Sequence, residues 1–196
     1  NVPREDVVQT CRSGQNIFRR LSQCPFVTVA AIDGICVGGG AELASWCDRR
    51  VMSDEPRTEF GFPEVQLGLF PGWGGTARSS RIVGLGNAVE LVTGGKSIDS
   101  HAATKMGYAT AVVSKDQLLN TAIQLVRLEQ QSGNYLKDRE IWRAPIDVNE
   151  TELGFLGITA SAYIQDQTKG NYPAPLAALE VMLGAASQDV DTACQM

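Results

Sequence analysis

The sequence predicts a domain of the α/β class that continues into a helical C-terminal part. Short β-branched runs alternate with amphipathic helical stretches up to about residue 131. Only helical patterns follow after that point. Thirteen of the 20 glycines lie between Gly34 and Gly95, which indicates a closely turned backbone suited to approach a ligand.

The first helix is predicted over residues 4–22, where an apolar stripe includes Val7, Val8 and Leu21. Cys24-Pro25 would end it, because proline disfavours helical geometry in the residue before it. The β-branched residues of 26–32 then predict a buried strand. The next predicted elements are a helix over 41–47, a strand over 50–53, helices over 74–83, 87–92 and 97–106, a strand over 109–113 and a helix over 115–131.

The connections between these elements contain most of the glycine and proline. Residues 35–40 are interpreted as backbone that leads into a helix, and residues 60–70 as a structured loop with a helical turn. Residues 134–149 predict a loop or short helix, and helices follow over 150–167 and 174–186. The sequence is therefore divided into a core of residues 1–131 and a helical part of residues 132–196.

Composition excludes several functional classes. The net charge of -5 argues against nucleic acid as the main partner, because phosphate binding needs a basic surface. No apolar run reaches the ~20 residues that a membrane-spanning helix needs. The five cysteines form no CxxC pair and there is one histidine, so zinc-ligand spacing is absent. We expect reduced thiols in a cytoplasmic protein.

Glu42 follows the triple glycine Gly38-Gly39-Gly40 at the start of a predicted helix. A bend at this point would leave backbone N–H groups free at the positive end of the helix dipole, where they can bind an oxyanion. Tight packing of helix on strand needs glycines equally. The triplet alone favours this packing interpretation.

Glu64 lies among apolar residues, with Phe62 before it and Val65 after it. Partial desolvation would raise its pKa and make it a proton donor or acceptor near neutral pH. A first-turn acid after Pro63, stabilised by the helix dipole, is the more ordinary interpretation. Two such carboxylates in one glycine-rich stretch favour paired acid–base chemistry, although the sequence does not bring them together.

Three longer stretches carry a family resemblance: AAIDGICVGGGAELASWCD, FGFPEVQLGLFPGWGGTARSSRIVG and AVELVTGGKSIDSHAATKMG. In this order, they are similar to the enoyl-CoA hydratase/isomerase (crotonase) superfamily over roughly residues 24–131. The later TKGNYPAPLAALE resembles a segment in the hydratase regions of multifunctional fatty-acid β-oxidation proteins. The resemblance implies a crotonase-type ββα spiral core with a helical C-terminal part.

The resemblance also implies roles for four residues. Glu42 and Glu64 match the two catalytic glutamates of the family. Gly39 matches a glycine of the oxyanion hole, whose N–H binds the thioester oxygen. Gly72 matches a glycine whose N–H helps to place the attacking water. In family hydratases the glutamate matched by Glu42 assists attack on the β-carbon, and the one matched by Glu64 delivers a proton to the α-carbon.

The sequence departs from the family pattern in two places. Ala77 and Ser79-Ser80 replace a Gln and a Leu-Pro common in the family, which removes no catalytic group. The family also carries about two βαβ-type stretches before the point matched by residue 1. These stretches hold the second oxyanion N–H and an AGAD-like segment that helps to bind the CoA adenine. The core is therefore expected to be incomplete at its N-terminal side, and activity to be in doubt if the protein begins at Asn1.

Retention of both glutamates favours an enoyl-CoA hydratase that adds water reversibly, in a syn manner, to a trans-2-enoyl-CoA. The alternatives are a Δ3,Δ2-enoyl-CoA isomerase that uses Glu64 alone and a non-catalytic fragment with the crotonase fold. The resemblance implies no metal or redox cofactor, since coenzyme A enters as part of the substrate. The expected partners are an acyl-CoA thioester and either further copies in a trimer-based homo-oligomer or the rest of a larger multifunctional chain.

Overall fold

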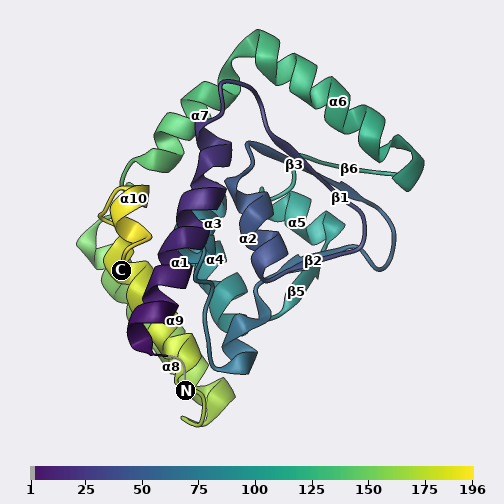
Figure 1. Cartoon of the computed structure of the whole chain (residues 1–196). Coiled ribbons are helices and arrows are strands. Elements are labelled where there is room, and N and C mark those ends of the chain that lie inside the picture. The colour runs from purple at the N-terminus through teal and green to yellow at the C-terminus, as the bar shows by residue number, and fades with distance from the viewer. Residues whose placement is uncertain (1–2) are drawn as a thin grey trace.

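A computed structural model describes residues 3–196, so the first two residues of the predicted core lie outside it (Figure 1). The strands form two three-stranded sheets. In the first sheet, β1 pairs in parallel with β3, and β3 pairs in parallel with β6. In the second sheet, β4 pairs in parallel with β2 and antiparallel with β5. The strands are β1 (Val29–Ile32), β2 (Ile35–Val37), β3 (Arg49–Ser53), β4 (Glu59–Gly61), β5 (Ser97–Asp99) and β6 (Ala111–Val113).

Helices surround the two sheets and make up the end of the chain. Helix α6 lies against the β1-β3-β6 sheet, whereas α8 and α9 lie against α4 at the other end of the molecule (Figure 1). The helices are α1 (Arg4–Arg19), η1 (Arg20–Gln23), α2 (Gly39–Trp46), η2 (Pro63–Leu67), α3 (Gly75–Val83), α4 (Leu85–Gly94), α5 (Ser100–Met106), α6 (Lys115–Ser132), α7 (Asn134–Arg143), α8 (Glu150–Thr168), α9 (Ala174–Ala185) and α10 (Val190–Ala193).

The predicted α/β class is confirmed: strands alternate with helices up to α6, and only helices follow. Local sequence signals explain several boundaries. Asp99 caps α5 by accepting a hydrogen bond from the N–H of Ala102, as its position before a helix favours. Asn149 and Glu152 form a capping box at the start of α8.

Three predicted segments were wrong in part, although the helical turn expected within residues 60–70 is present as η2. The helix expected over 97–106 begins at Ser100, because residues 97–99 pair with β4 instead. The stretches 35–40 and 60–70 were interpreted without strands, yet they contain β2 and part of β4. Each of these strands is three residues long, so periodicity is too short to reveal it, and its pairing partner is distant in sequence. The prediction for 134–149 left open a loop or short helix, and α7 occupies the first ten of these positions.

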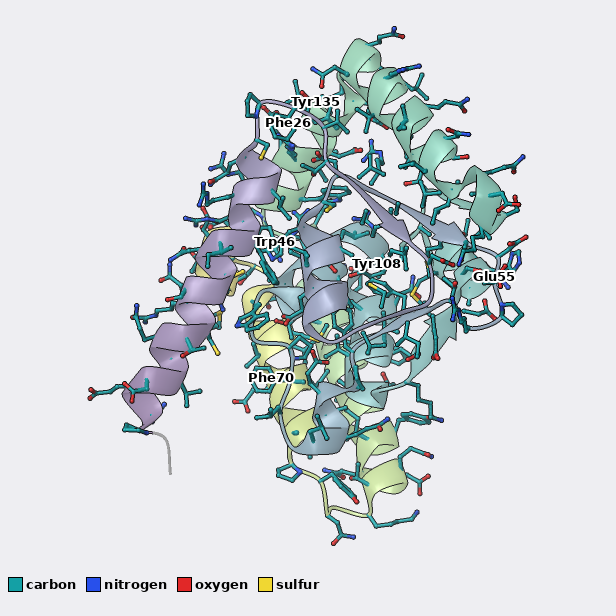
Figure 2. All side chains as sticks on the ribbon, turned by 45° about the vertical axis from the view of Figure 1, so that its right-hand side comes forward. Phe26, Trp46, Glu55, Phe70, Tyr108 and Tyr135 are labelled. Carbon is teal, nitrogen blue, oxygen red and sulfur yellow. The ribbon has the colours of Figure 1, made fainter. Side chains whose placement is uncertain are left out.

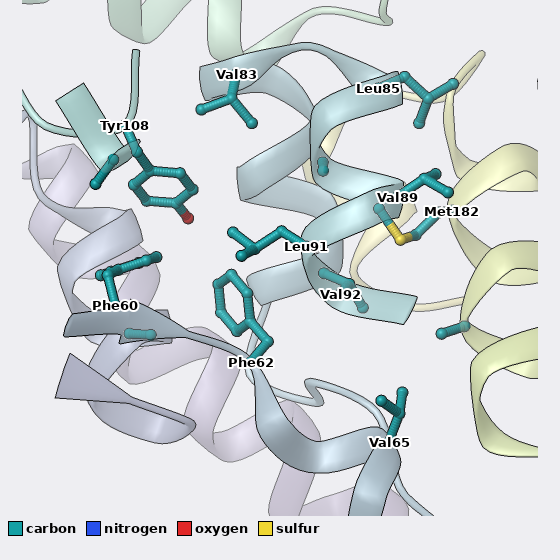
Figure 3. Packing of buried hydrophobic residues seen from close by; sticks show 14 of the residues in the cluster. Phe60, Phe62, Val65, Val83, Leu85, Val89, Leu91, Val92, Tyr108 and Met182 are labelled. Carbon is teal, nitrogen blue, oxygen red and sulfur yellow. The ribbon is translucent and has the colours of Figure 1, made fainter. Parts of the chain in front are cut away.

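The main core joins the second sheet to the helices α4 and α9 (Figure 3). The Phe60 ring lies 5.6 Å from that of Phe62, edge to face, and 4.3 Å from that of Tyr108. Val92 of α4 and Met182 of α9 are buried in the same cluster. Burial of each large apolar side chain stabilises the fold by about 1.5–3 kcal/mol. The proposed division at residue 131 stays a prediction, and one core contains residues from both parts.

A buried carboxylate ties three distant segments together. Asp48, which is 1% exposed, accepts hydrogen bonds from the N–H and the hydroxyl of Thr28 at 2.8 and 2.9 Å. Arg139 of α7 donates to its two oxygens at 2.6 and 2.7 Å, and to the carbonyl of Cys24 at 2.6 Å. The pair therefore fixes α7 against the segment that joins α1 to β1.

Among residues 3–196, no helix combines the length and the apolar composition needed to cross a bilayer.

Candidate active site

The site is built around the bend that begins α2. Gly38 has φ 57° and ψ -131°, a backbone conformation that is open to glycine and strained for other residues. Its N–H donates to the carbonyl of Gly61 in β4 at 3.1 Å, which fixes the bend to the second sheet. Gly39 is the first residue of α2, and no side chain of the described chain caps this helix. The first N–H groups of a helix have no intrahelical acceptor, so they are available to an anion.

The indole of Trp73 covers Gly39. A Cβ atom at position 39 would lie 2.8 Å from Cζ3 of this ring, so a side chain there would displace it. The same ring packs edge to face on Phe18 of α1, with the centroids 5.4 Å apart. Trp46, which lies on the side of the molecule that α1 covers (Figure 2), donates from Nε1 to the carbonyl of Trp73 at 2.9 Å. Position 39 must therefore lack a side chain so that the Trp73 ring can pack there, and this also leaves the N–H of Gly39 accessible to a ligand.

Glu42 lies one turn into α2 and is 3% exposed. Its Oε1 accepts hydrogen bonds from the N–H of Trp73 at 2.7 Å and from the N–H of Gly75 at 2.9 Å. Burial raises the pKa of Glu42 to about 7, although these two hydrogen bonds lower it, and the nearby charge of Glu64 raises it further. A carboxyl group with such a pKa can take or give a proton near neutral pH.

Glu64 lies in the first turn of η2, after Pro63, and is half-buried. Its Oε2 is buried without a hydrogen-bond partner in the described part of the chain. Its Oε1 points toward the bend of α2, since a Cβ atom on Gly38 would lie 3.6 Å from it. Burial raises the pKa of Glu64. An unpartnered buried carboxylate oxygen is costly, and its retention favours a functional role.

The structure brings three of the four predicted site residues together. Glu64 lies beside the bend that precedes Gly39, and its charge acts on Glu42. Gly72 lies in the loop that holds Glu42, but the N–H groups that reach the carboxylate belong to Trp73 and Gly75. The roles of the four residues stay predictions.

Sequence reasoning missed the donors to Glu42 and the residue that holds their loop. Gln15 of α1 donates from Nε2 to the carbonyl of Gly72 at 2.8 Å. The glycine-rich sequence GWGG signals a tight loop, but it does not say which N–H points to which acceptor. Nothing in the sequence distinguishes Gln15 from the other polar residues of its amphipathic helix.

Comparison with known proteins identifies the family of the chain. Residues 4–140 match the family model described as enoyl-CoA hydratase/isomerase. The chain is 40% identical over 173 residues to the fatty acid oxidation complex subunit alpha of Vibrio vulnificus, and 38% identical over 172 residues to that of Shewanella amazonensis. These matches cover 87% and 88% of the chain but 24% of each relative, so the chain spans about a quarter of their length.

Solved structures share the fold. An enoyl-CoA hydratase from Bacillus anthracis superposes with a TM-score of 0.61 at 27% identity, over 86% of this chain and 62% of that one. DspI from Pseudomonas aeruginosa has the same TM-score and identity over 72% of this chain and 57% of its own. The predicted crotonase-type architecture is thereby confirmed. The chain belongs to the enoyl-CoA hydratase/isomerase family.

Proposed function

We propose that this chain carries the site of an enoyl-CoA hydratase, which reversibly adds water to a trans-2-enoyl-CoA and gives a 3-hydroxyacyl-CoA. The observation that carries the proposal is the pairing of Glu42 and Glu64, two desolvated carboxylates with raised pKa values beside the uncapped start of α2. Hydration of this kind needs one group to remove a proton from water and another to supply a proton to carbon.

In the proposed reaction the two glutamates hold the water between them. Because both N–H donors engage Oε1 of Glu42, its Oε2 is left for the water. Glu42 takes a proton from this water as the oxygen forms a bond to the β-carbon, and the electron pair of the double bond moves toward the thioester. Glu64, which starts protonated, then delivers its proton to the α-carbon, and the carbonyl re-forms. Before the next turnover Glu42 loses the proton it took and Glu64 regains one through solvent.

Negative charge develops on the thioester oxygen during the attack. The N–H of Gly39, at the positive end of the α2 dipole, is the proposed donor to this oxygen. A single preorganised donor of this kind typically stabilises a transition state by about 2.7–4 kcal/mol. Coenzyme A is the carrier of the substrate, and the proposed chemistry uses protein groups alone.

Crotonyl-CoA tests the proposal. The 196-residue chain is expected to cause loss of the enoyl absorbance, and Glu42→Gln to abolish most of this loss. Absence of turnover by a chain that unfolds cooperatively would instead favour the non-catalytic fragment. A 3-enoyl-CoA substrate separates the remaining alternative, because an isomerase that uses Glu64 alone would retain its activity in Glu42→Gln.

The pH profile gives a further expected result. Glu42 must be ionised to accept a proton, so its pKa of about 7 sets the acid limb of the profile, and hydration is lost as the pH falls through that value. Between pH 8 and pH 6 we expect kcat/KM for crotonyl-CoA to fall by about tenfold. Thermal unfolding measured at both pH values controls for loss of the folded state. A value of kcat/KM that does not change between pH 6 and pH 8 would contradict the assignment of Glu42 as the base.

We further propose that the substrate belongs to fatty-acid β-oxidation, because the relatives from Vibrio and Shewanella are named as fatty acid oxidation complex subunits. Their greater length favours a role within a larger multifunctional chain, with a trimer-based homo-oligomer as the other proposed assembly. The five free cysteines support the expected cytoplasmic location.

A further inference from the structure

We propose that Gln15 is a positioning residue for Glu42, acting through the peptide group that joins Gly72 to Trp73. This inference rests on the proposed function, because it assigns Gln15 to the placement of the base in that reaction. Gln15 does not contact Glu42 itself through any hydrogen bond of the described chain.

The carbonyl of Gly72 and the N–H of Trp73 are the two ends of one peptide group. Gln15 Nε2 donates to the carbonyl at 2.8 Å, and the N–H donates to Oε1 of Glu42 at 2.7 Å. A peptide group is planar and the two bonds point in opposite directions from it, so fixing the carbonyl also orients the N–H. Hydrogen bonds in such a chain also polarise one another, which strengthens the bond to the carboxylate.

The loop around Trp73 depends on the hydrogen bond from Gln15 to fix the orientation of its first peptide group. Trp73 stands between Gly72 and Gly74, and Gly74 has φ 105°, so the backbone has little intrinsic preference for one orientation of the peptide. The next peptide group along the chain has its own anchor, since its carbonyl accepts the bond from Trp46. The hydrogen bond from Gln15 is the corresponding anchor for the peptide group that joins Gly72 to Trp73.

The position of Gln15 is itself determined by packing. Its neighbour Gly14 lies against the Trp73 ring so closely that a Cβ atom there would be 2.4 Å from Cδ1. This contact sets the distance between α1 and the loop. Gln15 also lines a cavity of about 230 Å³ together with Trp46 and polar residues of α1 and the C-terminus. A changed side chain at position 15 therefore has space, and its replacement does not require the core to repack.

Loss of this anchor has a specific electrostatic consequence. The N–H bonds from Gly75 and Trp73 lower the pKa of Glu42, against burial and the charge of Glu64, which raise it. Glu64 is the ionisable group whose charge acts on Glu42. A loosened Trp73 N–H stabilises the carboxylate less, so the pKa of Glu42 rises. Hydration, which needs the ionised form, is then lost at a higher pH than in the parent protein.

The variant Gln15→Met tests the inference, because methionine is similar in length and cannot donate. We expect kcat for crotonyl-CoA to fall by about three- to tenfold, while KM stays within about twofold. The acid limb of kcat/KM should move to higher pH by about half a unit or more. A titration of the ¹³C-labelled Glu42 carboxyl by NMR, assigned with Glu42→Gln, should move in the same direction without any substrate.

Gln9→Met is the matched control, since Gln9 is exposed on the same helix. It should leave the kinetics, the titration and the thermal unfolding at their parent values. The inference is overturned if Gln15→Met leaves both the pH profile and the Glu42 titration at the values of the parent. If the parent itself fails to hydrate crotonyl-CoA, the proposed function fails, and the NMR titration still decides whether Gln15 positions Glu42. Gln15→Ala, which suits a helix, gives the same comparison should the methionine variant not fold.

Discussion

Glu64→Gln is expected to lower kcat for crotonyl-CoA hydration by about 10²- to 10⁴-fold, the range that a positioned acid or base contributes. Glutamine has almost the same shape as glutamic acid but cannot deliver a proton to the α-carbon. Oε2 of Glu64 is buried and unpartnered among the described residues, so no neighbouring group is held by it. The loss should therefore be in chemistry, with substrate binding nearly unchanged and no fall in the free energy of unfolding, because Glu64→Gln removes a desolvated charge.

Steady-state kinetics measure kcat and KM, and urea unfolding measures the free energy of unfolding. Glu90→Gln is the matched control, because Glu90 is an exposed glutamate of α4. It should retain the parent kcat. A loss of less than about tenfold in Glu64→Gln would contradict its assignment as the proton donor.

The largest effect on stability is expected from Asp48→Ala. This change leaves the largely buried guanidinium of Arg139 without its carboxylate and removes the acceptor for the N–H of Thr28. Breaking a buried ion pair on one side typically costs about 3–5 kcal/mol, because a buried charge is left uncompensated. Since the pair joins α7 to the segment before β1, the whole fold should lose stability.

The free energy of unfolding from urea titration measures this effect. Asp54→Ala changes an exposed aspartate next to the end of β3 and should alter the free energy by no more than about 0.5 kcal/mol. If Asp48→Ala lowers stability by less than about 1 kcal/mol, the ion pair is not the link between these segments that the geometry indicates.

The longer elements could be predicted from local patterns because their signals lie within the elements themselves. The amphipathic stripe of α1 and the apolar face of α6 each extend over several turns, and a glycine with positive φ ends α6 at residue 133. The strands β2 and β5 could not be predicted in this way. Each becomes a strand only by pairing with β4, so the information lies in another part of the chain.

The same distinction applies to the site. Apolar neighbours and a preceding proline or glycine made Glu64 and Glu42 candidates, and the family resemblance assigned their roles. The hydrogen bonds that hold Glu42 come from a loop more than 30 residues later, as the N–H donors of Trp73 and Gly75 illustrate. Backbone N–H groups are the same in every residue except proline, so their direction is a property of the fold. Gln15 could not be predicted either, because the carbonyl that its side chain reaches lies 57 residues later in the chain.

The indole of Trp73 also constrains how this family member can change over evolutionary time. Its ring occupies the space that a side chain would need at Gly14 in α1 and at Gly39 in α2. Positions 14, 39 and 73 therefore share one fixed volume, although they are far apart in the chain. A larger residue at position 14 therefore favours a smaller one at position 73. Either change alone destabilises the protein, because the first overpacks the contact and the second leaves a cavity.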